Sequence, residues 1–133
     1  MDKLEYIPGD FISVYVGIKK YIVEVIGTEN ENEVLSYQIK FPNGEIQYAD
    51  KDNIVPIPLT PEILEKNGWK NDGYDWYKLP TKRAYLYITK DIITLGEFLV
   101  CVGLDRHNLA SINFVHQLQH ILFGLRLNSE MEV

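Results

Sequence analysis

The 133-residue sequence contains a single cysteine, Cys101, so no disulfide can form within the chain. Without a disulfide framework, nothing in the sequence points to an oxidising compartment. The first residues, which include Asp2, Lys3 and Glu5, lack the apolar centre of a secretion signal. No apolar run approaches the roughly 20 residues that a membrane-spanning helix needs. We therefore expect a cytoplasmic protein that does not associate with a membrane.

The sequence is also short of basic residues. Its 13 Lys and Arg stand against 19 Asp and Glu, which gives a net charge of −6. Residues 1–60 hold five basic and ten acidic residues, whereas residues 61–133 hold eight and nine. An acidic chain repels phosphate backbones unless its basic residues are grouped. The composition therefore disfavours nucleic acid as a partner.

Several motifs that carry chemistry are absent: a phosphate-binding loop, a dinucleotide fingerprint, a nucleophile elbow and the kinase signatures. Asp105 and His107 lie in one polar stretch, but an Asp/His pair without a nucleophile is weak support for catalysis. The acidic stretch 29–33, with Asp50 and Asp52, lacks the spacing of a calcium loop. We predict a protein that is not an enzyme and that has no catalytic residue and no cofactor.

Residues 7–57 predict a β-meander. The alternation over residues 34–41 places Tyr37 and Ile39 on one face of a strand. Asn43-Gly44 predicts a tight hairpin turn, because both residues tolerate a positive φ. The expected strands cover residues 11–16, 21–26, 34–41, 46–48 and 52–57, with an acidic loop over 27–33. Five short strands with tight turns favour an SH3-like five-stranded β-barrel or meander.

Residues 60–133 predict a smaller β region with two helices. Thr60-Pro61-Glu62 is a helix start, with an N-cap hydroxyl, a proline and a carboxylate at the positive end of the helix dipole. Asn67-Gly68 ends that helix, and Trp69 is expected to be a packing anchor. Strands are expected over 74–79, 83–89 and 98–103, then a polar connection over 104–108 and a helix over about 109–127. The expected fold class is α+β, divided into residues 1–59 and 60–133, which could also form a single domain.

The last predicted helix has two different faces. At about 100° per residue, its apolar side chains share one wedge of the helix surface. They are Phe114, Val115, Leu118, Ile121, Leu122 and Leu125. His116 and His120 lie opposite, but two histidines fall short of a zinc ligand set, and Gln117 stands where a zincin motif needs Glu. We predict no metal site and interpret this face as a contact with another domain or with a second copy in a homodimer. Its residues are His116, Gln117, His120 and Phe123.

The best candidate for a ligand-binding surface lies between Trp76 and Lys90. On the expected strand, Arg83, Tyr85 and Tyr87 point to the same side, so they could stack on bases or hold a phosphorylated ligand. The same pattern is typical of an ordinary exposed sheet face, because cross-strand aromatic pairs stabilise sheets. The residues of this candidate surface are Lys78, Lys82, Arg83, Tyr85 and Tyr87.

Two stretches carry a resemblance to a known group of proteins. Residues 54–69 (IVPIPLTPEILEKNGW) and 114–125 (FVHQLQHILFGL) resemble segments of small uncharacterised proteins encoded by Bacteroides-type gut phages and related mobile elements. The resemblance extends to the general plan, an N-terminal β part followed by a helix and a C-terminal helix. It implies a phage or prophage origin and action inside a bacterial host cell, and it carries over no catalytic residue.

Together these patterns predict a non-enzymatic binding protein of a phage or mobile element that acts on a host component as an adaptor or inhibitor. Its acidity and its nine tyrosines suit contact with a host protein. The alternative is a protein that sequesters a nucleotide-like small molecule, such as a defence signal, through Arg83, Tyr85 and Tyr87. A second alternative is a module that binds single-stranded nucleic acid, which would require a basic groove.

Overall fold

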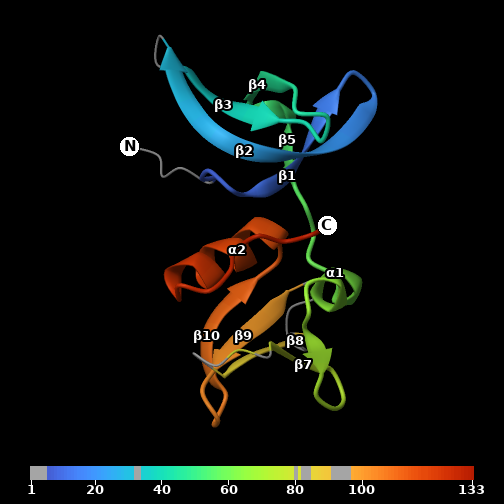
Figure 1. Ribbon diagram of the computed structural model, residues 1–133, viewed down its shortest axis with the longest axis vertical. Helices are drawn as coiled ribbons and strands as arrows, with labels where there is room; N and C mark the ends of the chain where they lie inside the picture. The colour runs from blue at the N-terminus through green and yellow to red at the C-terminus, as the bar shows by residue number, and fades with distance from the viewer. Residues whose placement is uncertain (1–5, 32–33, 80, 82–84, 91–96) are drawn as a thin grey trace.

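The computed structural model describes residues 6–31, 34–79, 81, 85–90 and 97–133. These residues form two antiparallel five-stranded sheets and two helices, which is an α+β arrangement. One sheet lies at each end of an elongated molecule, and both helices lie between them (Figure 1). The strand order is β4-β3-β2-β1-β5 in the first sheet and β10-β9-β8-β7-β6 in the second.

The first sheet is built from residues 11–56. Its strands are β1 (Phe11–Val16), β2 (Lys19–Glu31), β3 (Val34–Lys40), β4 (Ile46–Asp50) and β5 (Ile54–Pro56), with a short 3-10 turn (Lys51–Asn53) before β5. Tyr37 and Ile39 are 1% and 2% exposed, which confirms the predicted alternation. Gly44, at φ 90°, forms the predicted turn between β3 and β4. Tyr6 packs its ring edge-on against Tyr37, with 5.4 Å between the ring centroids, and so adds the segment before β1 to this core.

Strand β2 is longer than predicted. It extends to Glu31 through residues expected to form an acidic loop over 27–33. Thr28 pairs with Tyr37 and Glu29 pairs with Ser36, after a bulge between Val25 and Gly27. The prediction was wrong because a ladder of hydrogen bonds to β3 outweighs the low strand propensity of glycine, asparagine and glutamate.

The first sheet is strongly curved, but it is not closed into a barrel (Figure 1). Within the described residues, its edge strands β4 and β5 are not paired with each other. The SH3-like barrel therefore stays a prediction. The buried apolar side chains form two clusters, one inside the first sheet and one between the second sheet and the helices.

The second sheet carries both helices on one face. Its elements are α1 (Pro61–Lys66), β6 (Lys70–Asn71), β7 (Trp76–Leu79), β8 (Leu86–Lys90), β9 (Phe98–Val102), β10 (His107–Ile112) and α2 (Val115–Gly124). Ile88 and Val100 pack toward the helices and are fully buried, as are Leu64 of α1 and Leu118 of α2. Trp69 is 2% exposed in the same core, which confirms its predicted role as an anchor.

Helix α1 begins where the sequence predicts. The Thr60 hydroxyl accepts a hydrogen bond from the Ile63 amide at 3.2 Å, and Pro61 occupies the first helical position. An N-cap hydroxyl of this kind satisfies one of the amide groups that the first helical turn leaves without a partner. Asn67 ends the helix, also as predicted.

The region before α2 differs from the prediction of a polar connection over 104–108 and a helix from about 109. Residues 107–112 form strand β10, and α2 begins only at Val115, with Phe114 as its N-cap. Ser111 pairs with Leu99 and Ile112 pairs with Phe98 on β9. The helical pattern was wrong here because antiparallel pairing with the preceding strand β9 overrides local propensity.

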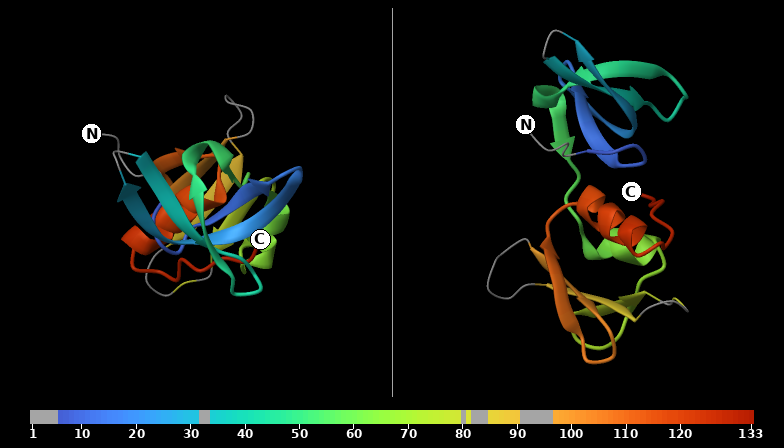
Figure 2. Two further views of the ribbon diagram at one scale, coloured as in Figure 1. Left: turned by 90° about the horizontal axis from the view of Figure 1, so that it is seen from above. Right: turned by 90° about the vertical axis from the view of Figure 1, so that its left-hand side faces the viewer.

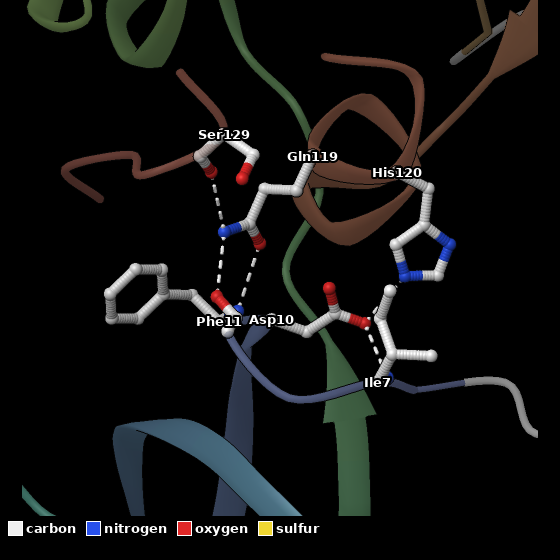
Figure 3. A network of polar contacts seen from close by, with 7 residues as sticks. Ile7, Asp10, Phe11, Gln119, His120 and Ser129 are labelled. Atoms are coloured by element: carbon white, nitrogen blue, oxygen red, sulfur yellow. Dashed lines mark hydrogen bonds and ion pairs between the residues drawn. The ribbon is translucent and has the colours of Figure 1, made fainter. Parts of the chain in front are cut away.

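One buried side chain of α2 connects the helix to the segment that leads into β1 and to the segment that follows α2. Gln119 is 3% exposed, and its Oε1 accepts a hydrogen bond from the Phe11 amide at 2.9 Å. Its Nε2 donates to the Gly9 carbonyl at 2.9 Å and to the Ser129 carbonyl at 3.0 Å (Figure 3). The oxygen and the nitrogen of this amide therefore both have partners, which lie in two separate parts of the backbone.

A second connection runs along the segment between β5 and α1, which passes beside the start of α2 (Figure 2). The Leu59 amide donates to the Asn113 carbonyl, and the Val115 amide donates to the Ile57 carbonyl, each at 2.9 Å. No helix in the described part of the chain is long and apolar enough to cross a membrane.

Replacing Gln119 with leucine should lower the free energy of unfolding by about 3 kcal/mol or more. The Phe11 amide and the Ser129 carbonyl, both of half-buried residues, would lose their side-chain partner, as would the carbonyl of the exposed Gly9. A polar group left without a partner costs about 1–3 kcal/mol where water cannot reach it. Urea denaturation of the wild type and the variant measures the difference. The control is Gln47→Leu, since Gln47 is exposed and donates only to Glu45. A loss no larger than that of the control would contradict the role given to Gln119.

Candidate binding surface

The outer face of the second sheet, which points away from the helices, brings together three of the predicted ligand-binding residues. Lys78 of β7 lies opposite Tyr87 of β8. The Lys78 Nζ lies 5.4 Å from the ring centroid of Tyr85 and 5.8 Å from that of Tyr87. Lys82 and Arg83, the other two residues of the predicted surface, lie outside the described residues.

Arg106, from the turn between β9 and β10, covers part of this face. Its guanidinium carbon lies 4.5 Å from the ring centroids of both Trp76 and Tyr87. Its Nη2 forms an ion pair with the Asp72 carboxylate at 3.0 Å. A guanidinium group is planar and weakly hydrated, so it stacks on aromatic rings while it keeps its hydrogen bonds. Arg106 thereby joins the turn before β7 to the turn before β10.

This arrangement changes which aromatic rings a ligand can reach. Tyr87 is only 5% exposed, so its ring cannot stack on a base unless Arg106 moves. Tyr85, at 47% exposure, is the accessible ring of the predicted pair. The outer face therefore offers one tyrosine and one lysine, rather than the row of stacking side chains that the sequence suggests.

The two turns that Arg106 joins expose large apolar side chains at their tips. Tyr74 is 99% exposed in the turn over residues 72–75, and Leu104 is 74% exposed in the turn over 103–106. Both turns lie at the end of the molecule farthest from the first sheet (Figure 1). We call Tyr74, Trp76, Leu104 and Arg106 the turn-end surface.

Sequence reasoning missed Tyr74 and Leu104, although a local signal is present. Each follows a turn glycine and precedes an aspartate, in Gly73-Tyr74-Asp75 and Gly103-Leu104-Asp105. The glycines adopt φ 92° and 87°, and Tyr74 itself adopts φ 50°. A tight turn at the protein surface has no packed layer beneath its central residues. An apolar side chain at that position therefore projects into solvent.

Asp105 and His107 meet near this surface, but in a setting that does not suggest catalysis. The His107 Nε2 lies 2.6 Å from the Asp105 Oδ2, and the two side chains are 77% and 68% exposed. Catalytic acids and bases depend on partly desolvated surroundings, whereas pairs this exposed are common on protein surfaces.

The predicted contact face of α2 lies partly against the first sheet. His116 is 2% exposed, with its ring centroid 4.8 Å from that of Tyr6. The His120 Nε2 lies 2.7 Å from the buried Asp10 carboxylate (Figure 3). Gln117 instead accepts a hydrogen bond from the Phe114 amide at the start of α2, and Phe123 is 68% exposed. The two histidines therefore form a contact within the chain, and Phe123 does not belong to it.

Burial governs the ionisation of this contact. Burial and the neighbouring His120 lower the pKa of His116 to about 4, so its ring is neutral at pH 7. Burial raises the pKa of the Asp10 carboxyl above its usual value, against the opposing effects of the Ile7 amide and His120. The described residues contain no group of three or more His, Cys, Asp or Glu side chains that could hold a metal ion.

Cavities of about 620, 270, 270 and 250 Å³ lie away from the outer sheet face, since none of these four is lined by Lys78, Tyr85 or Tyr87. Small molecules bind in concave sites that enclose most of their surface.

Comparisons of the chain with protein-family models, curated proteins and solved structures found no match. No relative therefore supplies a ligand or a residue role.

The stability of the protein should fall as the pH drops from about 6.5 toward 4. His116 has its pKa lowered by folding, so the unfolded chain takes up the proton first and gains stability relative to the native state. The full effect is about 3 kcal/mol, and protonation of Asp10, whose pKa is raised, offsets part of it. Urea denaturation at pH 7, 5.5 and 4.5 measures the slope.

The variant His116→Phe tests this assignment, because a phenyl ring keeps the contact with Tyr6 and cannot be protonated. The variant should lose less stability than the wild type between pH 7 and pH 4.5. Equal losses in the two proteins would show that another group controls the pH dependence.

Proposed function

We propose that this chain is a non-enzymatic binding protein that recognises a protein partner through the turn-end surface. The observation that carries the proposal is the exposure of Tyr74 and Leu104, 99% and 74%, on two turns that Arg106 holds together. Large apolar side chains at solvent-exposed tips gain free energy when a partner removes them from water. The turns are anchored to a packed sheet, so less conformational entropy is lost on binding.

The residue types of this surface favour a protein over other partners. Tyrosine, tryptophan and arginine are the side chains that most often dominate the binding energy of protein interfaces. Trp76 and Arg106 are already ordered by their mutual contact, and Asp72 fixes the guanidinium group. An interface built from them is preorganised, like loops presented by a rigid scaffold.

The charges around the surface indicate what the partner should look like. The carboxylate of Asp72 is paired with Arg106, and that of Asp105 contacts His107. Asp75 and Asp105 each follow an exposed apolar tip in the sequence. These carboxylates would repel a phosphate backbone. A partner with apolar pockets bordered by lysine or arginine is complementary to such a surface.

The expected partner is a component of a bacterial host cell, with the chain acting as an adaptor or inhibitor. This part of the proposal depends on the resemblance of residues 54–69 and 114–125 to segments of phage and mobile-element proteins. The turn-end surface adds a physical means of binding, which does not depend on that origin.

Replacing Tyr74 and Leu104 with serine should abolish partner binding and leave the fold intact, because both side chains lie outside the core. Affinity purification from bacterial lysate with quantitative mass spectrometry identifies proteins retained by the wild type and lost with the double variant. The dissociation constant of a purified candidate should then rise at least tenfold. The control is Ile18→Ser, which removes an apolar side chain that is 98% exposed in the turn between β1 and β2. Retention of the same proteins by all three chains would reject the surface.

A second candidate function, binding of a nucleotide-like ligand or single-stranded nucleic acid, is favoured by one observation. The Lys78 ammonium lies beside the exposed ring of Tyr85, a pairing that can hold a phosphate and stack a base. This function would use the outer sheet face rather than the turn tips.

If this second function operates, the wild type should bind a fluorescent single-stranded oligonucleotide or ATP, and Lys78→Ala with Tyr85→Ala should weaken binding at least tenfold. Fluorescence anisotropy at two salt concentrations measures the affinity and its ionic component. Tyr15→Ala is the matched control, since Tyr15 is 45% exposed on the first sheet. Absence of binding by the wild type to either probe would exclude the second function.

A further inference from the structure

The segment that follows α2 is extended and seated in the body of the protein, although it belongs to no sheet. Residues 128–133 have no helical or strand structure. Alternate side chains nevertheless point inward, as in a β-strand that packs on a surface. The inward residues Leu127, Ser129, Met131 and Val133 are buried or half-buried, and the outward residues Asn128, Glu130 and Glu132 are exposed.

Side-chain amides, rather than a neighbouring strand, hold the backbone of this segment. The Asn67 Nδ2 donates to the Glu132 carbonyl at 2.8 Å, and the Asn67 Oδ1 accepts from the Glu132 amide at 2.7 Å. Asn67 is itself fixed at the end of α1, because its Nδ2 also donates to the Ile63 carbonyl. Gln119 donates to the Ser129 carbonyl. Such bonds recognise an extended backbone whatever its side chains are.

Met131 is the apolar anchor between these two polar contacts. It is 5% exposed and belongs to the core of the second sheet and helices. Cavities of about 620 and 270 Å³ lie beside it, and Asn67, Asn128, Glu130 and Met131 line both. The smaller cavity reaches Trp69 and Leu122, so the groove has room beyond what the segment fills.

We infer that this groove, formed by Asn67, Trp69, Gln119 and Leu122, is a recognition site for an extended segment of a protein partner, and that residues 127–133 occupy it in this structure. The partner segment would carry methionine or another unbranched apolar side chain, with polar or acidic residues on either side. It would make the same backbone hydrogen bonds to Asn67 and Gln119. The groove is distinct from the turn-end surface, so the two sites can be tested separately.

The resident segment and a partner segment would make equivalent contacts in the groove. A partner segment replaces each hydrogen bond and the buried methionine, so the resident segment keeps only the advantage of being tethered. A substitution that weakens the resident segment should therefore make the groove available to a peptide in trans.

The test uses the full-length chain and a fluorescein-labelled synthetic peptide with the sequence of residues 127–133. Met131→Ala in the protein removes the resident anchor, and the peptide should then bind at least tenfold more tightly than it binds the wild type. A peptide with alanine in place of methionine should bind at least tenfold more weakly. Fluorescence anisotropy measures both affinities, and circular dichroism checks that the variant is folded.

A second variant leaves the core unchanged. Glu132→Pro removes the amide that donates to Asn67 but keeps Met131, and its control, Glu132→Ala, keeps the amide. Glu132→Pro should bind the peptide more tightly than Glu132→Ala does. Failure of folded Met131→Ala and Glu132→Pro chains to bind the peptide would overturn the inference. A dimer that forms at rising protein concentration, with no peptide present, would assign the groove to a second copy and overturn it as well.

Amide hydrogen exchange of the wild type tests whether the segment leaves the groove, even if both variants unfold. The Glu132 amide should exchange through a local opening, at least tenfold faster than the Leu118 amide inside α2. If Glu132 exchanges only as fast as the slowest amides of the core, the segment does not leave the groove and the inference fails.

Discussion

The structure depends on the complete hydrogen bonding of one buried amide, that of Gln119. A primary amide taken out of water must find partners for its oxygen and its nitrogen. Otherwise its desolvation penalty lowers the stability of the folded state. Here those partners are backbone groups of Gly9, Phe11 and Ser129. These bonds fix how the entry to β1, the middle of α2 and the segment after α2 meet in this structure. The contact between His120 Nε2 and the Asp10 carboxyl group lies at the same boundary.

The sequence predicted correctly those features of the fold that depend on interactions between residues close together in the chain. The alternation around Tyr37, the N-cap at Thr60 and the burial of Trp69 were all confirmed. In each case, a residue's own chemistry and its nearest neighbours specify its environment.

The sequence failed where contacts between separate elements decide the outcome. Residues 109–112 look like the start of a helix, but the preceding strand β9 offers them a strand partner. Tyr87 looks like an accessible ring, but Arg106 reaches it from another turn and covers it. His116 looks like part of a displayed face, but Tyr6 covers it from the first sheet. No spacing rule reports such contacts, because they depend on which faces meet after folding.

The hydrogen bond from Phe11 to Gln119 joins residues 108 positions apart. The hairpins β1-β2, β2-β3 and β3-β4 of the first sheet need only neighbouring segments, so they can form while the rest of the chain is still being synthesised. Until α2 exists, the end of that sheet near Tyr6 and Asp10 has nothing to pack against. The joint around Gln119 must therefore close late in folding, after the entropy of a long loop has been lost. Weakening it should speed unfolding more than it slows folding, and the two halves of the molecule would separate at this boundary first.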